Sequence, residues 1–159
     1  MDARVGLKPP RHFIDLNEID ARVLRRVVDM AHEMKKSGRR VPKSLRPKDI
    51  EDMVLVMIFE KPSTRTRVSF DVAMRQLGGQ TIALNHTDTQ LGRGEPISDT
   101  AKVLSRYADA LMVRANAHAT VTELAEHATI PVINGLTDVS LPCQIVGDIV
   151  AFEETRGAI

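Results

Sequence analysis

The apolar positions of the chain follow two kinds of pattern. Between residues 19 and 34 they recur three or four positions apart, which predicts an amphipathic helix. Asn17 is placed to cap the start of this helix, and Gly38 to end it. From residue 53 onwards, short apolar runs of strand length alternate with segments of helical spacing. The chain is therefore expected to begin with one helix and to continue as alternating strands and helices.

The alternating part contains the stretches of a layered α/β protein. The run "MVLVMIF" is apolar throughout, as expected for a strand that is covered on both faces. Strand–helix alternation at this spacing predicts right-handed crossovers and a parallel sheet. We therefore expect a three-layer α/β sandwich in which helices flank a parallel sheet of about four strands. The predicted strands are 53–59, 81–84, 110–113 and 131–134, and the predicted helices are 67–77, 99–108, 120–128 and 142–156.

Two of these helices carry more detailed expectations. Thr120 and Glu123 have the spacing of a capping box at the start of their helix. In the last helix, which Ser140 and Pro142 open and Gly157 stops, the inner face is expected to include Ile145, Ile149 and Phe152. The pair Glu153–Glu154 is expected to lie on a solvated face.

Composition limits the classes of partner. A chain of 159 residues with 43% apolar and 27% charged residues is typical of one soluble domain with a real core. Aromatic residues make up only 3%, which argues against a surface that stacks nucleic-acid bases. The net charge of +1 provides no overall field for polyanions. We expect no nucleic-acid partner, and any anion site must be local.

The cellular setting follows from cysteine usage and apolar runs. Cys143 is the only cysteine, so no internal disulfide can form and a reducing compartment is expected. No run is long and apolar enough for a signal peptide or a membrane span. We expect a cytoplasmic protein with no membrane partner. The basic stretch 35–48 could instead mark a nucleic-acid or membrane patch, but a solvated loop is the favoured interpretation.

Groups that bind anions follow the predicted strands. The segment "STRTR", Ser63 to Arg67, comes after the first strand and opens a helix, and Arg114 ends the third strand. Gln144 lies in the first turn of the last helix. Because ligands of open parallel sheets bind outside the carboxyl ends of the strands, these groups are expected at one edge. Helix N-termini and arginine forks both suit phosphate.

A simpler interpretation is that Ser63 only caps a helix and that Arg65 and Arg67 are solvated. For the pentapeptide alone the two interpretations are equally good, but Arg114 and Gln144 at the same edge favour an anion site. The sequence has no P-loop, and "GRGEPI" lacks the third glycine of a dinucleotide fingerprint.

Other reactive side chains give weaker signals. Cys143 lies near a helix N-terminus, which could lower its pKa, but a small buried apolar role is favoured. The histidines lack the spacing of metal ligands; they are His12, His32, His86, His118 and His127. His86 and His118 fall near the predicted site edge, and we expect ordinary loop and cap roles for these two.

Three segments together carry a family resemblance. "FEKPSTRTRVSFDVAMRQLGG", "QLGRGEPISDTAKVLSRYADALMVR" and "PVINGLTDVSLPCQIVGDIVAFEE" resemble, in order, the amino-terminal half of ornithine carbamoyltransferases. The Ser-x-Arg-Thr-Arg segment is shared with the wider aspartate/ornithine carbamoyltransferase family. Lys61 in "FEKPSTRTR" and Gln90 in "QLGRGEP" favour ornithine over aspartate as the second substrate.

The resemblance implies that residues 1–159 form a carbamoyl-phosphate-binding domain. Ser63, Thr64, Arg65 and Thr66 match the phosphate-binding segment, and Arg114 matches an arginine that contacts the phosphate and the carbamoyl oxygen. Gln144 matches a glutamine that orients the carbamoyl amide. Gln90 matches a residue given to the neighbouring subunit's site, which implies a homotrimer. Arg67 is expected in a structural ion pair behind the site.

The implied reaction needs no cofactor and no metal. The side-chain amine of ornithine attacks the carbamoyl carbon, which gives citrulline and phosphate in arginine biosynthesis. Positioning of the substrates and neutralisation of charge should supply most of the rate, with Arg65 and Arg114 as the catalytic groups.

Two departures from the family pattern affect this expectation. The family motif His-Pro-x-Gln is here Leu141-Pro142-Cys143-Gln144, so a donor to the carbamoyl oxygen is missing and impaired catalysis is expected. Family members also continue into a second, ornithine-binding domain, which this chain is expected to lack, so that alone it should be inactive. Two alternatives stay open: a stand-alone anion or carbamoyl-phosphate-binding module that has lost catalysis, and a trimerising scaffold with a vestigial site.

Overall fold

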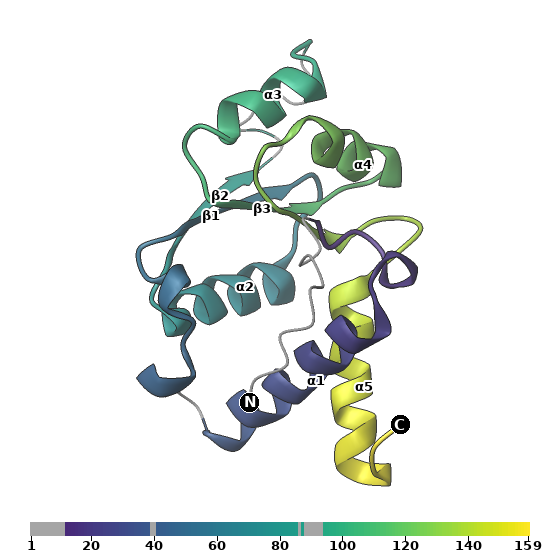
Figure 1. The fold of residues 1–159 in the computed structure, drawn as a ribbon. Coiled ribbons are helices and arrows are strands. Elements are labelled where there is room, and N and C mark those ends of the chain that lie inside the picture. The colour runs from purple at the N-terminus through teal and green to yellow at the C-terminus, as the bar shows by residue number, and fades with distance from the viewer. Residues whose placement is uncertain (1–11, 39–40, 86, 88–93) are drawn as a thin grey trace.

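The computed structural model describes residues 12–38, 41–85, 87 and 94–159 (Figure 1). The described strands form one parallel sheet in the order β2-β1-β3-β4, which confirms the predicted α/β fold. The strands are β1 Val54–Phe59, β2 Gln80–Asn85, β3 Ala110–Arg114 and β4 Val132–Leu136. The helices are α1 Ala21–Lys36, α2 Thr64–Leu77, α3 Ile97–Leu104, α4 His118–His127 and α5 Pro142–Arg156.

The sheet is the middle layer of the molecule. Figure 1 shows α3 and α4 on one face and α2 against the other, while α5, with α1 beside it, extends away from the sheet. Val56 and Ile58 of β1 pack into the cluster that includes α3 and α4 residues. Leu55, Met57 and Phe59 point the other way, towards side chains of α2. Because successive side chains of a strand alternate between faces, coverage of both faces explains the continuous apolar run.

The free edge of β4 is covered by the segment that precedes α1. The Phe13 N–H donates to the Val132 carbonyl at 2.8 Å, and the Asn134 N–H donates to the Phe13 carbonyl at 2.8 Å. The buried Asn134 amide also donates to the Ile14 carbonyl at 3.1 Å. Such pairing blunts an edge that would otherwise present unpaired backbone groups. It also fixes Phe13 and Ile14 beside the first half of β4.

Both predicted cap assignments at helix starts are wrong. Asn17 lies inside a short 3₁₀ turn, Leu16–Glu18, and it is the Asp20 carboxylate that accepts the Arg22 N–H at the start of α1, at 2.8 Å. Helix α4 starts before the expected Thr120–Glu123 box, and the Asp138 carboxylate from a later loop accepts its first N–H. A sequence window cannot reveal a cap that arrives from a distant loop. Gly38 follows the end of α1 with a positive φ of 87°, as expected.

The expected inner face of α5 is also wrong in part. Ile145 and Phe152 are 40% and 51% exposed, whereas Pro142 and Val150 are buried. The helix turns this face outward because α5 contacts β4 at its start and α1 further along. The contact with α1 includes ion pairs, and it buries a carboxylate that was expected to be solvated.

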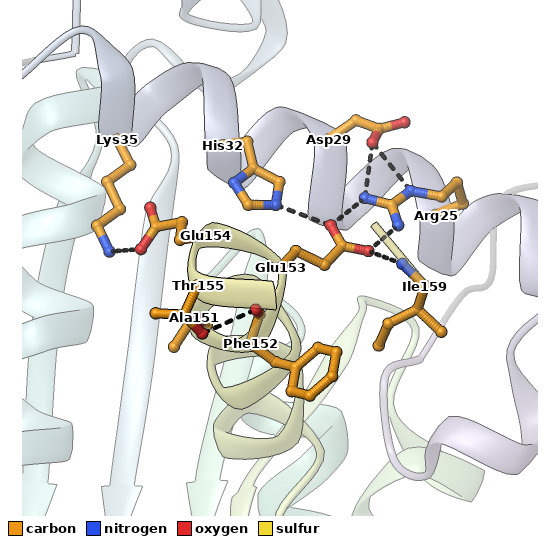
Figure 2. Close-up of polar contacts among 10 residues, drawn as sticks. All are labelled: Arg25, Asp29, His32, Lys35, Ala151, Phe152, Glu153, Glu154, Thr155 and Ile159. Atoms are coloured by element: carbon orange, nitrogen blue, oxygen red, sulfur yellow. Dashed lines mark hydrogen bonds and ion pairs between the residues drawn. The ribbon is translucent and has the colours of Figure 1, made fainter. Parts of the chain in front are cut away.

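That carboxylate belongs to Glu153, which is not on a solvated face as predicted. Its side chain is only 5% exposed, and Figure 2 shows it between α1 and the chain end. Arg25 donates to both carboxylate oxygens at 2.5 and 2.9 Å, and the His32 ring lies 2.9 Å from the second oxygen. The Ile159 N–H completes the set at 3.2 Å. Glu154 beside it is more exposed and contacts Lys35 alone among the described ion pairs.

These contacts predict an acid-sensitive junction between α1 and α5. The hydrogen bonds from Arg25, the Ile159 N–H and His32 lower the pKa of Glu153 from 4.5 to about 2. A carboxyl group whose pKa is lower in the folded state stabilises the fold above its unfolded pKa, and this contribution is lost as the pH falls through the folded pKa. Wild type should therefore lose its stability advantage over Glu153→Gln between pH 4.5 and about pH 2.

Urea unfolding of both proteins across that pH range measures the effect. Glu154→Gln, next to it on the same helix and more exposed, is the matched control and should leave the profile unchanged. A constant difference between wild type and Glu153→Gln from pH 5 to pH 2 would contradict the assignment.

Candidate functional site

An open hollow of about 790 Å³ lies at the carboxyl edge of the sheet, between the N-termini of α2 and α5. The hollow lies at the boundary between β1 and β3. From β1 the chain continues to β2 on one side of this boundary, and from β3 it continues to β4 on the other side. Ligands of open α/β sheets bind at such a switch point. Its described lining residues are Pro62, Ser63, Thr64, Arg65, Thr66, Ser69, Phe70, Arg114, Gly135, Leu136, Leu141, Cys143 and Gln144.

The floor of the hollow includes the first turn of α2. Ser63 precedes the helix in extended conformation, with φ −152° and ψ 111°, and its side chain makes no capping hydrogen bond within the described part of the chain. The simpler interpretation of Ser63 as a plain cap therefore has no support from its contacts. The backbone N–H groups of a first turn have no partner within their own helix and lie at the positive end of its dipole. Ser63, Thr64 and Arg65 thus surround a favourable place for an anion.

Arg114 brings a partly buried positive charge to the same place. Its Nη1 donates to the Thr66 hydroxyl at 2.9 Å, which ties the end of β3 to α2. Its Nε is buried and has no hydrogen-bond partner among the described residues. No carboxylate belongs to the described lining of the hollow. A buried donor on a charged group is costly to leave unpaired, so Arg114 has the environment of a residue that awaits an acceptor.

The first turn of α5 forms the opposite wall. The Gln144 amide nitrogen donates to the Asp148 carboxylate at 2.9 Å, which leaves the amide oxygen as the acceptor that Gln144 offers to a ligand. Leu141 lies at the N-cap position and is 37% exposed in the hollow. Burial raises the pKa of the Cys143 thiol to about 11, so the group stays neutral. Cys143 is half-buried in this wall rather than fully buried as expected, and its raised pKa does not support an activated thiol.

Arg67, which the sequence placed behind the site, does not line this hollow. Arg67 borders a neighbouring hollow of about 540 Å³, and its guanidinium donates to the amide oxygen of Asn85 at 3.4 Å. After Thr81 and Arg75, its charge helps to lower the pKa of Asp71. Gln90 and His86 lie outside the described residues.

Sequence patterns missed several wall residues. Phe70 and Leu136 are apolar and carry no signature of a site. Gly135 could have been found, because a glycine inside a strand often marks a bulge or a close approach of backbone. The pairing of β3 with β4 does shift there, from Val113 opposite Asn134 to Arg114 opposite Leu136.

The described residues show few signs of other chemistry. In ranges 12–38, 41–85 and 94–159, with Thr87, no three His, Cys, Asp or Glu side chains gather as metal ligands. No helix in the same ranges is long and apolar enough to cross a membrane. His118 starts α4 and contacts Thr137 and Asp15 rather than the hollow, as its expected loop or cap role requires.

Comparison with known proteins identifies this arrangement. The family described as "Aspartate/ornithine carbamoyltransferase, carbamoyl-P binding domain" matches residues 11–154. The chain belongs to this family. The hollow between α2, β3 and α5 is thus a pocket of a carbamoyl-P binding domain, and the resemblance of the sequence segments is confirmed.

The relatives that the chain resembles are ornithine carbamoyltransferases. That of Rhodopseudomonas palustris is 56% identical over 152 residues, which cover 94% of this chain and 49% of the relative. The solved ornithine carbamoyltransferase of Pyrococcus furiosus matches with a TM-score of 0.84 and 45% identity, over 94% of this chain and 47% of that one. The anabolic ornithine carbamoyltransferase of Campylobacter jejuni matches with a TM-score of 0.81 and 39% identity, over 91% and 45%. The chain spans about half the length of the relatives it matches.

The hollow depends on the close approach of β3 and β4 at Gly135. A Cβ added there would overlap the Met112 sulfur and lie 3.2 Å from the Val113 carbonyl oxygen. Gly135→Ala should therefore destabilise the fold by about 1–3 kcal/mol, because the methionine must repack. Gly147→Ala, in α5 with no atom within 4 Å of the added Cβ, should instead stabilise by up to about 1 kcal/mol. Urea unfolding of both variants measures the difference, and equal effects of the two would contradict the role given to Gly135.

Proposed function

We propose that the pocket binds carbamoyl phosphate through the residues that match the family motif. Ser63, Thr64, Arg65 and Thr66 hold the phosphate with their side chains and with the N–H groups of the first turn of α2. Arg114 bridges the phosphate and the carbamoyl oxygen, and the amide oxygen of Gln144 accepts from the carbamoyl NH₂ group. The proposal rests on one observation about Arg114. Its buried Nε has no hydrogen-bond partner among the described residues, while its Nη1 donates to the turn that would hold the phosphate.

In the complete enzyme the proposed reaction is transfer of the carbamoyl group to ornithine. The side-chain amine attacks the carbamoyl carbon, a C–N bond forms, and the C–O bond to phosphate breaks with its electron pair leaving on the phosphate. The amine loses a proton to give citrulline. Arg65 and Arg114 contribute by neutralising charge on the carbamoyl oxygen and the departing phosphate, and by holding the donor in place.

The partners belong to the same proposal. Ornithine binding requires the part of the relatives beyond the half that this chain matches, so these 159 residues alone should bind carbamoyl phosphate without turnover. We expect a cytoplasmic homotrimer in which Gln90 reaches a neighbouring subunit's site. We also expect the domain to extend over residues 1–159.

A second candidate is a binding module that has lost catalysis, and Leu141 favours it. Where the family motif has histidine, Leu141 offers the pocket an apolar side chain that cannot donate to a carbamoyl oxygen. Phosphate contacts come from α2 and β3 and do not involve this position. The two candidates therefore agree on binding and differ on turnover.

Substitution of Arg65 tests the binding site. Arg65→Ala removes a charged donor from the pocket, and calorimetric titration with a stable phosphonate analogue of carbamoyl phosphate should show about 10- to 100-fold weaker binding. Arg67→Ala is the matched control, because Arg67 lies in the same helical turn but lines the neighbouring hollow. Equal losses for the two variants, or no binding by wild type, would contradict the proposal.

Substitution of Leu141 tests the missing donor. Leu141→His should tighten binding of the phosphonate analogue, which carries a carbamoyl-type amide, by about 2- to 10-fold, the effect of one added hydrogen bond. Binding of inorganic phosphate, which has no carbamoyl oxygen, should stay the same. The same substitution in a version completed with the second domain should raise turnover by about 10²–10³. Equal turnover of the completed protein with and without the Leu141→His substitution would show that the apolar residue does not impair catalysis.

A further inference from the structure

His118 joins two segments that are far apart in sequence. Its Nδ1 lies 2.9 Å from the Thr137 hydroxyl, in the turn between β4 and α5. Its Nε2 lies 3.2 Å from the Asp15 carboxylate, in the segment that covers the edge of β4. The side chains of His118 and Asp15 are 21% and 23% exposed, and Thr137 is 4% exposed. The ring is therefore mostly enclosed between its two partners.

Thr137 organises the turn that leads into the pocket wall. Its backbone N–H donates to the Ser140 carbonyl at 2.9 Å. Its hydroxyl oxygen accepts from the Ser140 N–H at 3.1 Å and from the Val139 N–H at 3.4 Å. The next residue is Leu141, and Cys143 and Gln144 follow, all of which line the pocket. The position of this wall thus depends on the Thr137 hydroxyl.

The Thr137 hydroxyl has a single proton to donate, and this explains how His118 orients it. A threonine hydroxyl has two lone pairs and one proton, and the two N–H groups of the turn occupy the lone pairs. The proton is then left for His118 Nδ1 at 2.9 Å, a closer acceptor than the Ser140 carbonyl at 3.3 Å. With Nδ1 as acceptor, the ring carries its proton on Nε2 and donates to Asp15. One tautomer satisfies every group, so His118 aligns the hydroxyl with the turn.

A second bond fastens the same turn to the same residue. The Asp138 carboxylate accepts the His118 backbone N–H at 2.9 Å. Side chain and backbone of His118 therefore hold two successive residues of the turn. Asn134 adds a parallel tie, because its amide donates to the Ile14 carbonyl at 3.1 Å and to the Ser140 carbonyl at 3.4 Å.

We propose that His118 is a positioning residue of the pocket. It acts through Thr137 and Asp138 and holds the turn 137–140, so that the first turn of α5 keeps its place opposite α2. Because His118 also contacts Asp15, the segment before α1 helps to hold the pocket wall in place. The effect on ligand affinity rests on the proposed function, whereas the effect on the turn does not.

The test uses the full chain and four single variants. His118→Ala removes the ring, and Thr137→Val removes the hydroxyl at nearly constant shape. Thr137→Ser keeps the hydroxyl and should behave as wild type. His127→Ala is the matched control, because His127 lies at the other end of α4 and its ring contacts only the Glu123 carbonyl among the described bonds.

The first readout is the rate at which a neutral thiol reagent modifies Cys143, the only cysteine in the chain. Cys143 is half-buried in the wall that the turn holds, so its modification reports opening of that wall without any ligand. Loss of one hydrogen bond should raise the rate about 2- to 10-fold for His118→Ala and for Thr137→Val. In the double variant, which combines His118→Ala and Thr137→Val, Cys143 should be modified no faster than in the faster of the two single variants. The reason is that both substitutions break the same hydrogen bond.

The second readout is the affinity for the stable phosphonate analogue of carbamoyl phosphate, whose carbamoyl-type amide would contact the α5 wall, measured by calorimetry. The same two variants should bind about 2- to 10-fold more weakly, and Thr137→Ser and His127→Ala should bind as wild type does. If wild type does not bind the analogue, the proposed function fails, while the Cys143 rates still test the positioning role. Unchanged rates in Thr137→Val, with a lower melting temperature, would overturn the proposal and leave only a general structural role. If His118→Ala does not fold, the comparison of Thr137→Val with Thr137→Ser decides alone.

Discussion

The pairing of β1 with β3 is the interaction on which the pocket depends. In this register Phe59 lies opposite Arg114, and the Glu60 N–H donates to the Arg114 carbonyl at 2.9 Å. The next residues after β1 lead into α2, so the pairing alone brings the guanidinium to the first turn of that helix. A shift of one residue would turn Arg114 to the other face of the sheet. Both strands bury apolar side chains on both faces of the sheet.

The charge of Arg114 decides which kind of group this geometry suits. A structural arginine at such depth normally has a carboxylate or several carbonyl partners, as Arg25 has in Glu153. Arg114 has a single hydroxyl partner in the described part of the chain, and its Nε is buried without one. The two arginines show opposite solutions to the same problem. One charge is neutralised inside the protein and holds two helices together, and the other lines the hollow, with no carboxylate among the described lining residues.

Much of the fold could be predicted because the signals were local. Four apolar runs of strand length fixed the sheet, and the position of "STRTR" after the first run fixed the edge where the pocket lies. Two of the errors share one physical cause, which is a partner distant in sequence, whereas the Asn17 error is local, since the nearby Asp20 caps α1. Glu153 is buried because Arg25 lies 128 positions earlier, and α4 starts at His118 because Asp138 caps it from a later loop. Within the pocket, the charged and polar residues were predictable, but the apolar walls were not, since Phe70 and Leu136 have no pattern that separates them from core residues.

In the turn between β4 and α5 and at the start of α5, the residues that hold the pocket wall in place differ from the residue that lines it. Thr137 and Asp138 are bonded to α4, and through His118 to Asp15, whereas the leucine side chain at position 141 has no polar atom and gives the frame no hydrogen bond. The residue at this position can therefore change the chemistry of the wall without moving it. This explains how the chain keeps the fold of its relatives and the arginines of the family motif while it presents Leu141 to the pocket. The wall built by the first turn of α2 and the end of β3, and the wall built by the first turn of α5, are thus separate parts of one hollow, and a change of side chain on one wall need not disturb the other.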